Sequence, residues 1–329
     1  MRVLQTFVFV LLFFASFCQS DTLQVDNNSI RQDSFQLIFD ELTVIIEKDS
    51  TDFNALIERA DLVSGLNDNI YFSKIFGDQE IYHKALRDYS EAIVLRPYRY
   101  EAYFKRGLLK DRFLLYKEAL VDYDEALTYA WAKPDKMRVR VNRARLKAQL
   151  GERDVAIKDL EKALLEDREN HALLNTLALI HLEVEEYSKS LKYLNRALEF
   201  HPDDPVTFSN IGFVALNKGK FKQAIKIYDE QIEKNPEYSY MYSNRGFAKF
   251  QLGEKEEAME DLNMAIELDP INSFAYKNRA IIYLDLGKDD LACNDLQKAK
   301  DLGYTTAYND EVIKLLFDKC FNINQKPTK

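Results

Sequence analysis

The fold is decided by the stretch from residue 239 to residue 270, which reads SYMYSNRGFAKFQLGEKEEAMEDLNMAIELDP. Small residues occupy three places in it, at Gly246, Ala258 and Ala265. Small residues at these spacings let two antiparallel helices pack closely within one hairpin and let a neighbouring hairpin pack on them. Pro270 marks the point at which the second helix must stop. The stretch therefore predicts a helical hairpin.

The same pattern recurs at an interval of 34 residues, in copies that start at Met137, His171, Pro205, Ser239 and Ser273. An earlier copy starts at Tyr100 and is followed by three extra residues, in a segment that holds Trp131 and Pro134. The first copy starts near Phe53 and contains an insertion at residues 64–79. Repeats of this length indicate a solenoid in which each copy buries its apolar face on its neighbours.

The shared period, small positions and closing prolines resemble the tetratricopeptide repeat family. The resemblance implies an all-α solenoid of about seven helix-turn-helix repeats in a right-handed superhelix with helical caps. We expect the seven-repeat array at residues 53–306. Apolar residues with helical spacing predict a capping helix over 34–48, within an N-terminal extension at 21–52, and a second capping helix and tail at 307–329.

The first 20 residues have a different composition. Arg2 precedes an apolar run from Phe7 to Phe14, and short residues precede Asp21, which is typical of a secretory signal peptide cleaved after Ser20. The run is too short to span a bilayer comfortably. We expect an exported protein, periplasmic or secreted if the source is bacterial. In a second interpretation Cys18 becomes the lipidated first residue of a membrane lipoprotein, although bulky Phe17 precedes it.

Charge and composition argue against several classes of function. Removal of residues 1–20 takes away one base, Arg2, which leaves 44 Lys and Arg against 54 Asp and Glu. A net negative surface repels phosphate, so we expect no nucleic-acid partner. The four histidines lie in no metal motif, and neither a phosphate-binding glycine loop nor a nucleophile motif occurs. The sequence therefore predicts no enzyme, no cofactor and no metal.

Opposite charges recur in pairs across the two predicted helices of a repeat. Five copies carry arginine at the seventh place and aspartate sixteen places later, allowing for the insertion, whereas the other two copies replace both residues by uncharged ones. Because arginine occurs only where aspartate does, we predict structural contacts in the pairs Arg59–Asp88, Arg106–Asp122, Arg143–Asp159, Arg245–Asp261 and Arg279–Asp295. The alternative, in which the arginines bind a ligand, remains open.

The resemblance implies that the first helices line a concave groove that binds a segment of a protein or peptide partner. Asparagines at the sixth place offer both donors and acceptors to a partner main chain, and we expect them to face solvent. Aromatic and apolar side chains flank them. The candidates are Asn142, Arg145, Asn210, Phe213, Tyr240, Asn244, Phe247, Phe250, Phe274, Asn278 and Ile281.

Three other interpretations remain open. The asparagines can be a habit of the repeat, with the aromatic side chains packed on adjacent helices. The protein can also be a self-associating or lipid-anchored envelope component, or a binder of glycans or small molecules.

Cys293 and Cys320 are the cysteines left after cleavage at Ser20, and antiparallel packing would bring them close enough for a disulfide in an oxidising compartment. Two separate thiols are the alternative.

Overall fold

The protein is a stack of helical hairpins in the computed structural model, which describes residues 27–64, 78–302, 304 and 311–321. The expected signal peptide at 1–20, with Cys18, and nearly all of the insertion at 64–79 lie outside these residues. The described part contains helices and no strand. The all-α architecture predicted from the sequence is confirmed.

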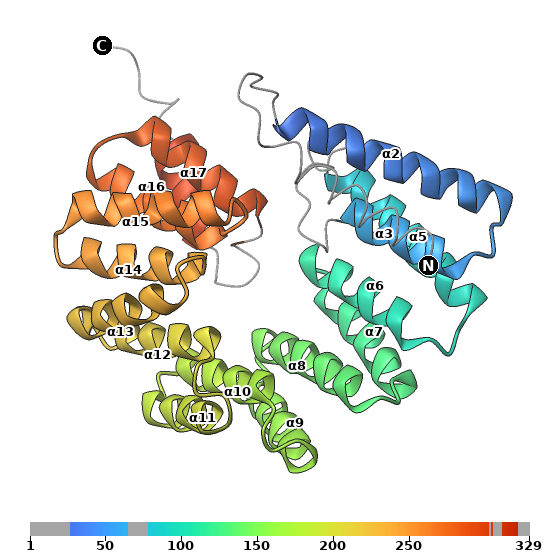
Figure 1. Cartoon of the computed structure of the whole chain (residues 1–329), viewed down its shortest axis with the longest axis horizontal. Helices are drawn as coiled ribbons and strands as arrows, with labels where there is room; N and C mark the ends of the chain where they lie inside the picture. The colour runs from blue at the N-terminus through green and yellow to red at the C-terminus, as the bar shows by residue number, and fades with distance from the viewer. Residues whose placement is uncertain (1–26, 65–77, 303, 305–310, 322–329) are drawn as a thin grey trace.

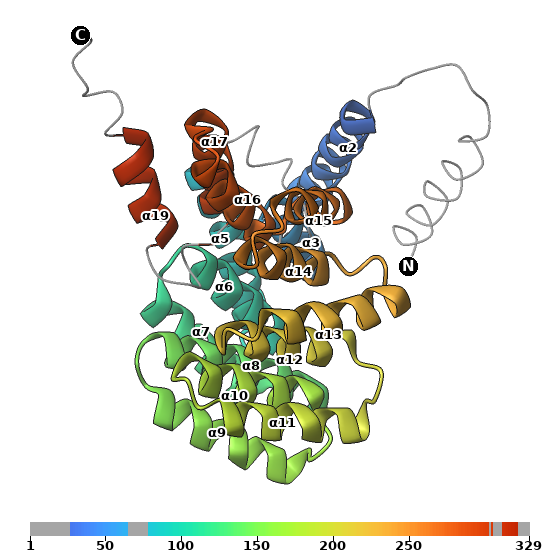
Figure 2. The same ribbon diagram turned by 90° about the vertical axis from the view of Figure 1, so that its left-hand side faces the viewer.

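Seven hairpins follow one another along the chain. They are α3 (Phe53–Ser64) with α5 (Asp78–Leu95), α6 (Tyr100–Arg112) with α7 (Tyr116–Tyr129), α8 (Lys133–Gln149) with α9 (Arg153–Glu166), α10 (His171–Glu183) with α11 (Tyr187–Phe200), α12 (Pro205–Asn217) with α13 (Phe221–Lys234), α14 (Ser239–Gln251) with α15 (Lys255–Leu268), and α16 (Ser273–Asp285) with α17 (Asp289–Asp301). Each second helix also contacts the first helix of the next hairpin. The solenoid curves into an open ring (Figure 1), and a side view shows its hairpins in layers (Figure 2).

Close packing within a hairpin depends on the small residues of the repeat. Ala258 and Ala265 of α15 are fully buried. A Cβ added to Gly246 of α14 would lie 3.0 Å from the carbonyl oxygen of Ala258, so the two backbones are close enough that even a methyl group would require a small shift. The periodic small residues thus set the spacing of the two helices.

The turn between the two helices is the same in six hairpins. The second residue after the first helix adopts a positive φ, and the amide of the residue that follows it donates to a carbonyl of the last helical turn. The positive-φ residues are Leu114, Gly151, Glu185, Gly219, Gly253 and Gly287. Glycine at four of these places follows from the steric cost of a left-handed backbone for other residues.

The third hairpin differs from the prediction at its start. The repeat period places its beginning at Met137, but α8 begins at Lys133 with Pro134 in its first turn. Proline is compatible with the first helical turn, where its missing amide has no helical partner. The three extra residues therefore extend a helix instead of forming a separate loop.

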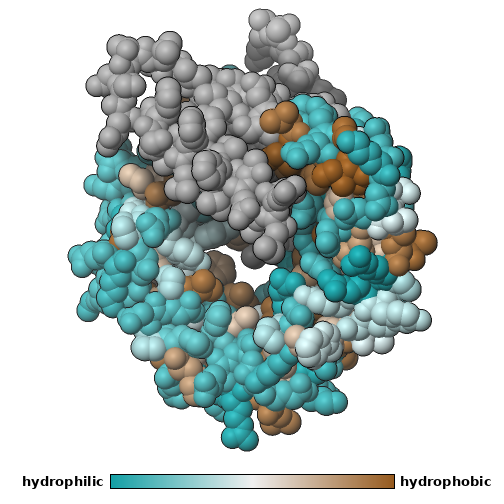
Figure 3. All heavy atoms as spheres, turned by 45° about the vertical axis from the view of Figure 1, so that its right-hand side comes forward, coloured by the Kyte–Doolittle hydropathy of each residue, from teal (hydrophilic) through white to brown (hydrophobic). Residues whose placement is uncertain are grey.

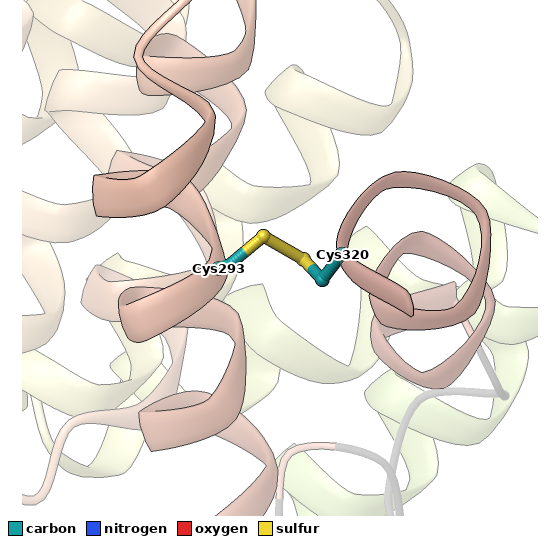
Figure 4. The surroundings of a disulfide bond; sticks show 2 residues. All are labelled: Cys293 and Cys320. Atoms are coloured by element: carbon teal, nitrogen blue, oxygen red, sulfur yellow. A yellow bond between two sulfur atoms is a disulfide. The ribbon is translucent and has the colours of Figure 1, made fainter. Parts of the chain in front are cut away.

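Helices cover both ends of the array. The N-terminal helix α2 (Asn27–Lys48) packs on α3 and begins seven residues before the predicted cap at Ser34. At the other end α19 (Glu311–Leu315) and the π-helical segment η1 (Leu316–Phe321) pack on α17. A disulfide joins Cys293 of α17 to Cys320 of η1, with Cα atoms 5.7 Å apart (Figure 4).

Candidate functional site

A pocket of about 320 Å³ lies between the first helices α8, α10 and α12. These helices contact one another from repeat to repeat and form the inner face of the ring. Asn170 and Asp204 cap α10 and α12, where their side chains accept hydrogen bonds from backbone amides of the first turn. Figure 3 shows a hollow within the ring with hydrophobic residues at its edge, whereas much of the outer surface is hydrophilic.

The pocket has an apolar side and a polar rim. Leu179 and Ile180 of α10 and Phe213 of α12 contribute apolar surface. The polar lining comprises Arg145, Gln149, Thr176, Glu183, Glu185, Tyr187 and Asn217. A concave site with apolar surface and a few polar groups is the usual form of a binding site in proteins.

Two of the groove candidates, Arg145 and Phe213, come together in this pocket. Leu179, which is not among the residues predicted for the groove, lies between them in the repeat pattern and is 36% exposed. Arg145, Leu179 and Phe213 all occupy the ninth place of consecutive repeats, and that shared place was the signal available in the sequence. Gln149 and Glu183 share the thirteenth place of their repeats, so the same kind of signal was available for them, whereas Glu185 lies in the turn after α10.

The sixth-place asparagines are largely engaged within the protein. The Asn210 amide donates to Asn175 Oδ1 at 2.7 Å, and Asn142 donates to the Arg138 carbonyl of its own helix at 3.0 Å. Asn244 forms a hydrogen bond with the buried hydroxyl of Tyr228. Asn278 is only 7% exposed and lies 3.4 Å from Ser243 Oγ in the preceding repeat. The expectation that these side chains face solvent is therefore wrong for Asn278, because its amide donates to the carbonyl and hydroxyl oxygens of Ser243 on the neighbouring first helix.

The remaining candidates lie near the C-terminal end of the array. The rings of Tyr240 and Phe274 are 6.1 Å apart, and Phe274 lies 5.2 Å from Tyr304. The Lys277 ammonium lies 5.7 Å from the Phe247 ring centroid. Phe250 packs on a core cluster, and Ile281 is half-buried. These residues form an aromatic segment of the array separate from the pocket.

Ion pairs that the sequence analysis missed join the first helices at the N-terminal end. Lys105 of α6 pairs with Asp61 of α3, and Arg145 of α8 pairs with Asp111 of α6. The Tyr89 hydroxyl also donates to Asp61 at 2.7 Å. Burial raises the pKa of Asp111, and Arg145 opposes the shift. Both buried carboxylates therefore have a cation on a neighbouring repeat, which links successive repeats.

The five arginine–aspartate pairs lie in contact across their hairpins. In four of them the guanidinium donates two hydrogen bonds to the carboxylate, as in Arg279–Asp295 at 2.7 and 2.9 Å. The other three are Arg59–Asp88, Arg106–Asp122 and Arg245–Asp261. The fifth pair is looser: Arg143 makes one bond to Asp159 at 3.1 Å and a second to Asp124. None of these ten residues lines the pocket.

None of the described helices combines the length and the apolar composition needed to cross a membrane. Within the same described residues, no cluster of three or more histidine, cysteine or acidic side chains is arranged to hold a metal ion.

Two family models for the tetratricopeptide repeat match the chain, one at residues 141–205 and one at 239–272. The fold is similar to the crystal structure of a tetratricopeptide repeat protein from Parabacteroides merdae, with a TM-score of 0.57 and 23% identity over 82% of this chain and 99% of that one. It is also similar to yeast Tom70, with a TM-score of 0.61 and 20% identity over 89% of this chain and 60% of that one. A search of curated proteins gave no significant match. The parts of the chain that these models match, residues 141–205 and 239–272, are tetratricopeptide repeats.

Proposed function

We propose that the protein is a non-catalytic scaffold that binds a segment of another protein on the inner face of the ring. The pocket between α8, α10 and α12 carries this proposal, because it combines apolar surface with hydrogen-bonding groups from three consecutive repeats. An extended segment presents side chains and main-chain groups at regular intervals, which suits a surface built from repeats. The known behaviour of tetratricopeptide repeats as protein-interaction scaffolds supports the same assignment.

Substitution of the pocket's apolar residues tests the proposal. Leu179→Ser with Phe213→Ser should reduce partner capture at least tenfold, since central apolar contacts dominate most protein interfaces. The matched control is Val155→Ser with Leu165→Ser on α9, which removes two exposed apolar side chains outside the pocket. Equal loss of capture in both variants, with folding intact by circular dichroism, would reject the inner face as the binding surface.

We also propose that the protein is exported. The apolar leader before Asp21 supports export, as does the Cys293–Cys320 disulfide, since disulfides persist mainly in oxidising compartments. N-terminal sequencing of the native protein tests this directly. Asp21 at the N-terminus agrees with a soluble exported form, a lipid-modified Cys18 agrees with a lipoprotein, and an intact Met1 contradicts both.

A further inference from the structure

Gln149 provides the first indication of what the pocket binds. Its side-chain oxygen Oε1 is buried and accepts no hydrogen bond in the structure, and Gln149 lines the pocket. An unpaired buried acceptor is costly because it has lost its water without gaining a partner. A ligand in the pocket could satisfy this oxygen with an N–H or O–H donor once the Gln149 side chain rotates toward it, because the oxygen itself is closed to solvent.

The charges around the pocket are predominantly negative. Glu183 and Glu185 line it together with one basic residue, Arg145. Arg145 already donates to Asp111 on the preceding repeat, so its charge is balanced by a carboxylate outside the pocket. Glu183 has a looser partner, since Arg153 Nε lies 3.7 Å from its carboxylate and both side chains are nearly half exposed. The site thus offers more anionic than cationic charge to an occupant.

The environment of Glu183 agrees with this imbalance. Burial raises its pKa, and the nearby Arg153 only partly opposes the effect. An additional cation next to the carboxylate would favour the ionised form and compensate for the lost solvation.

Glu185 adopts a backbone conformation that glutamate disfavours. Its φ is 59°, at the turn place where four other repeats have glycine. A non-glycine residue in this left-handed region carries a conformational cost, and such outliers cluster at functional sites. Here the cost places a glutamate at the rim of the pocket, where glycine would be the less strained choice.

From these features we infer that the pocket binds a lysine or arginine side chain of an extended partner segment. The aliphatic stem lies along Leu179 and Phe213, and the cationic head lies between Glu183, Glu185 and the Gln149 oxygen. A long basic side chain suits this arrangement, because its stem is apolar and its head carries several donors. The pocket, at about 320 Å³, lies at the small end of ligand sites and accommodates a side chain with its adjoining main chain. This inference rests on the proposed function and specifies the chemistry of the partner.

Blocked hexapeptide libraries test the inference without knowledge of the partner. Five positions are randomised, and the third is fixed as lysine, arginine, norleucine, glutamine or glutamate. The fraction retained by immobilised full-length protein is measured for each library. The lysine and arginine libraries should be retained about tenfold better than norleucine, which has the apolar stem without the charge. Glutamate should be retained least.

Three variants, one of them a control, locate the preference. Glu183→Gln with Glu185→Gln should bring lysine and norleucine to near parity, whereas Glu256→Gln with Glu257→Gln, on the exposed first turn of α15, should leave the preference unchanged. Glu185→Gly should raise the melting temperature by removing the unfavourable φ, yet weaken retention of the lysine library. A purely structural role for Glu185 predicts no change in retention.

The outcomes separate this inference from the proposed function. Retention of all libraries alike, with loss on Leu179→Ser and Phe213→Ser, keeps the scaffold function and overturns the basic-ligand inference. A lysine preference that survives the double glutamine variant places the cation elsewhere and also overturns it. No retention of any library above the level of a blank support overturns both.

Discussion

The aromatic ring of Tyr228 lies directly against the backbone of Gly212, so that a Cβ on Gly212 would come within 2.4 Å of the ring carbon Cζ. Tyr228 belongs to α13 and is completely buried, and its hydroxyl donates to the Ser209 carbonyl at 3.3 Å. The ring thus extends from α13, the second helix of the hairpin, against the backbone of α12, the first helix, and its hydroxyl also forms a hydrogen bond with Asn244. Tyr123 approaches Gly107 in the same way, and a Cβ on Gly107 would lie 2.8 Å from the ring carbon Cε1 of Tyr123.

Gly212→Ala should therefore destabilise the array, although alanine favours helix formation at most helical sites. Overpacking of a closed core costs about 1–3 kcal/mol, and the buried Tyr228 ring has little room to move. The free energy of unfolding from urea denaturation measures the loss. Combination with Tyr228→Leu should recover part of it, because the Ala144–Leu160 and Ala178–Leu194 pairs already occupy these places in other repeats. A neutral or stabilising Gly212→Ala would contradict the close contact.

The arginine–aspartate pairs should differ in their contribution to stability. Asp295 is buried, and Arg279 is its sole cationic partner among the described residues, so Arg279→Leu should cost about 3 kcal/mol. Arg143→Leu should cost about 1 kcal/mol, because Asp159 is one-third exposed and keeps Lys147 at 2.9 Å. Urea denaturation of the two variants gives the comparison. Equal losses of unfolding free energy in the two variants would show that burial of the aspartate does not determine the cost of removing its arginine.

Replacement of both members of a pair tests their direct contact. The fourth repeat has Leu177 and Tyr193 at the two equivalent places. The double variant Arg279→Leu with Asp295→Tyr introduces the same two residue types into the last repeat. The double variant should be more stable than Arg279→Leu alone, because no buried carboxylate is left without a partner. Strictly additive losses would mean that the two residues do not interact.

Asp111 should make stability depend on pH in the opposite sense to an ordinary salt-bridged aspartate. Burial holds its pKa above the ordinary value of an aspartate, so the folded state binds the proton more tightly than the unfolded state. The associated stabilisation is present below the unfolded pKa and is lost as pH rises through the folded pKa. Asp111→Asn should therefore raise the melting temperature at pH 7 relative to the parent, with a smaller difference near pH 4. A lower melting temperature at pH 7 would show that the Arg145 pair outweighs the burial cost.

Reduction of the Cys293–Cys320 disulfide should loosen the C-terminal cap. The bond closes a loop with a sequence separation of 27, for which the chain-entropy model gives about 3.5 kcal/mol as an upper estimate. Limited proteolysis with and without dithiothreitol should show faster cleavage in residues 311–321 after reduction, with Cys293→Ser behaving like the reduced parent. Two titratable thiols in the unfolded, oxidised protein would exclude the bond.

The repeat pattern predicted the backbone better than the side chains. The interval of 34 residues located the start of α10, α12, α14 and α16, because small residues and turn residues determine where helices pack and end. It failed at α8, where three extra residues continue the helix through Lys133 and Pro134. The repeat period identifies equivalent positions in successive repeats. It therefore contains no information about the structure of the three extra residues.

The candidate site was less predictable for the same reason. The period identified the sixth place as a groove position, yet Asn278 turns its amide to Ser243 and Asn210 turns to Asn175. The partner of a side chain depends on neighbours one repeat away, which differ from copy to copy. Gln149 and Glu185 were not predicted as groove residues, and the unpaired oxygen and the positive φ that distinguish them are visible only in three dimensions.

Site-specific photo-crosslinking tests the central claim, that the inner face binds the partner, most directly. A benzophenone amino acid replaces Leu179 in the pocket or, as the control, Val155 on α9, and the two native side chains are 36% and 44% exposed. Irradiation in the native compartment should join one defined protein to the Leu179 position, and Glu183→Gln with Glu185→Gln should reduce the yield. The Val155 position should give no specific product. Equal labelling at both positions, or a product at Val155 alone, would contradict binding on the inner face.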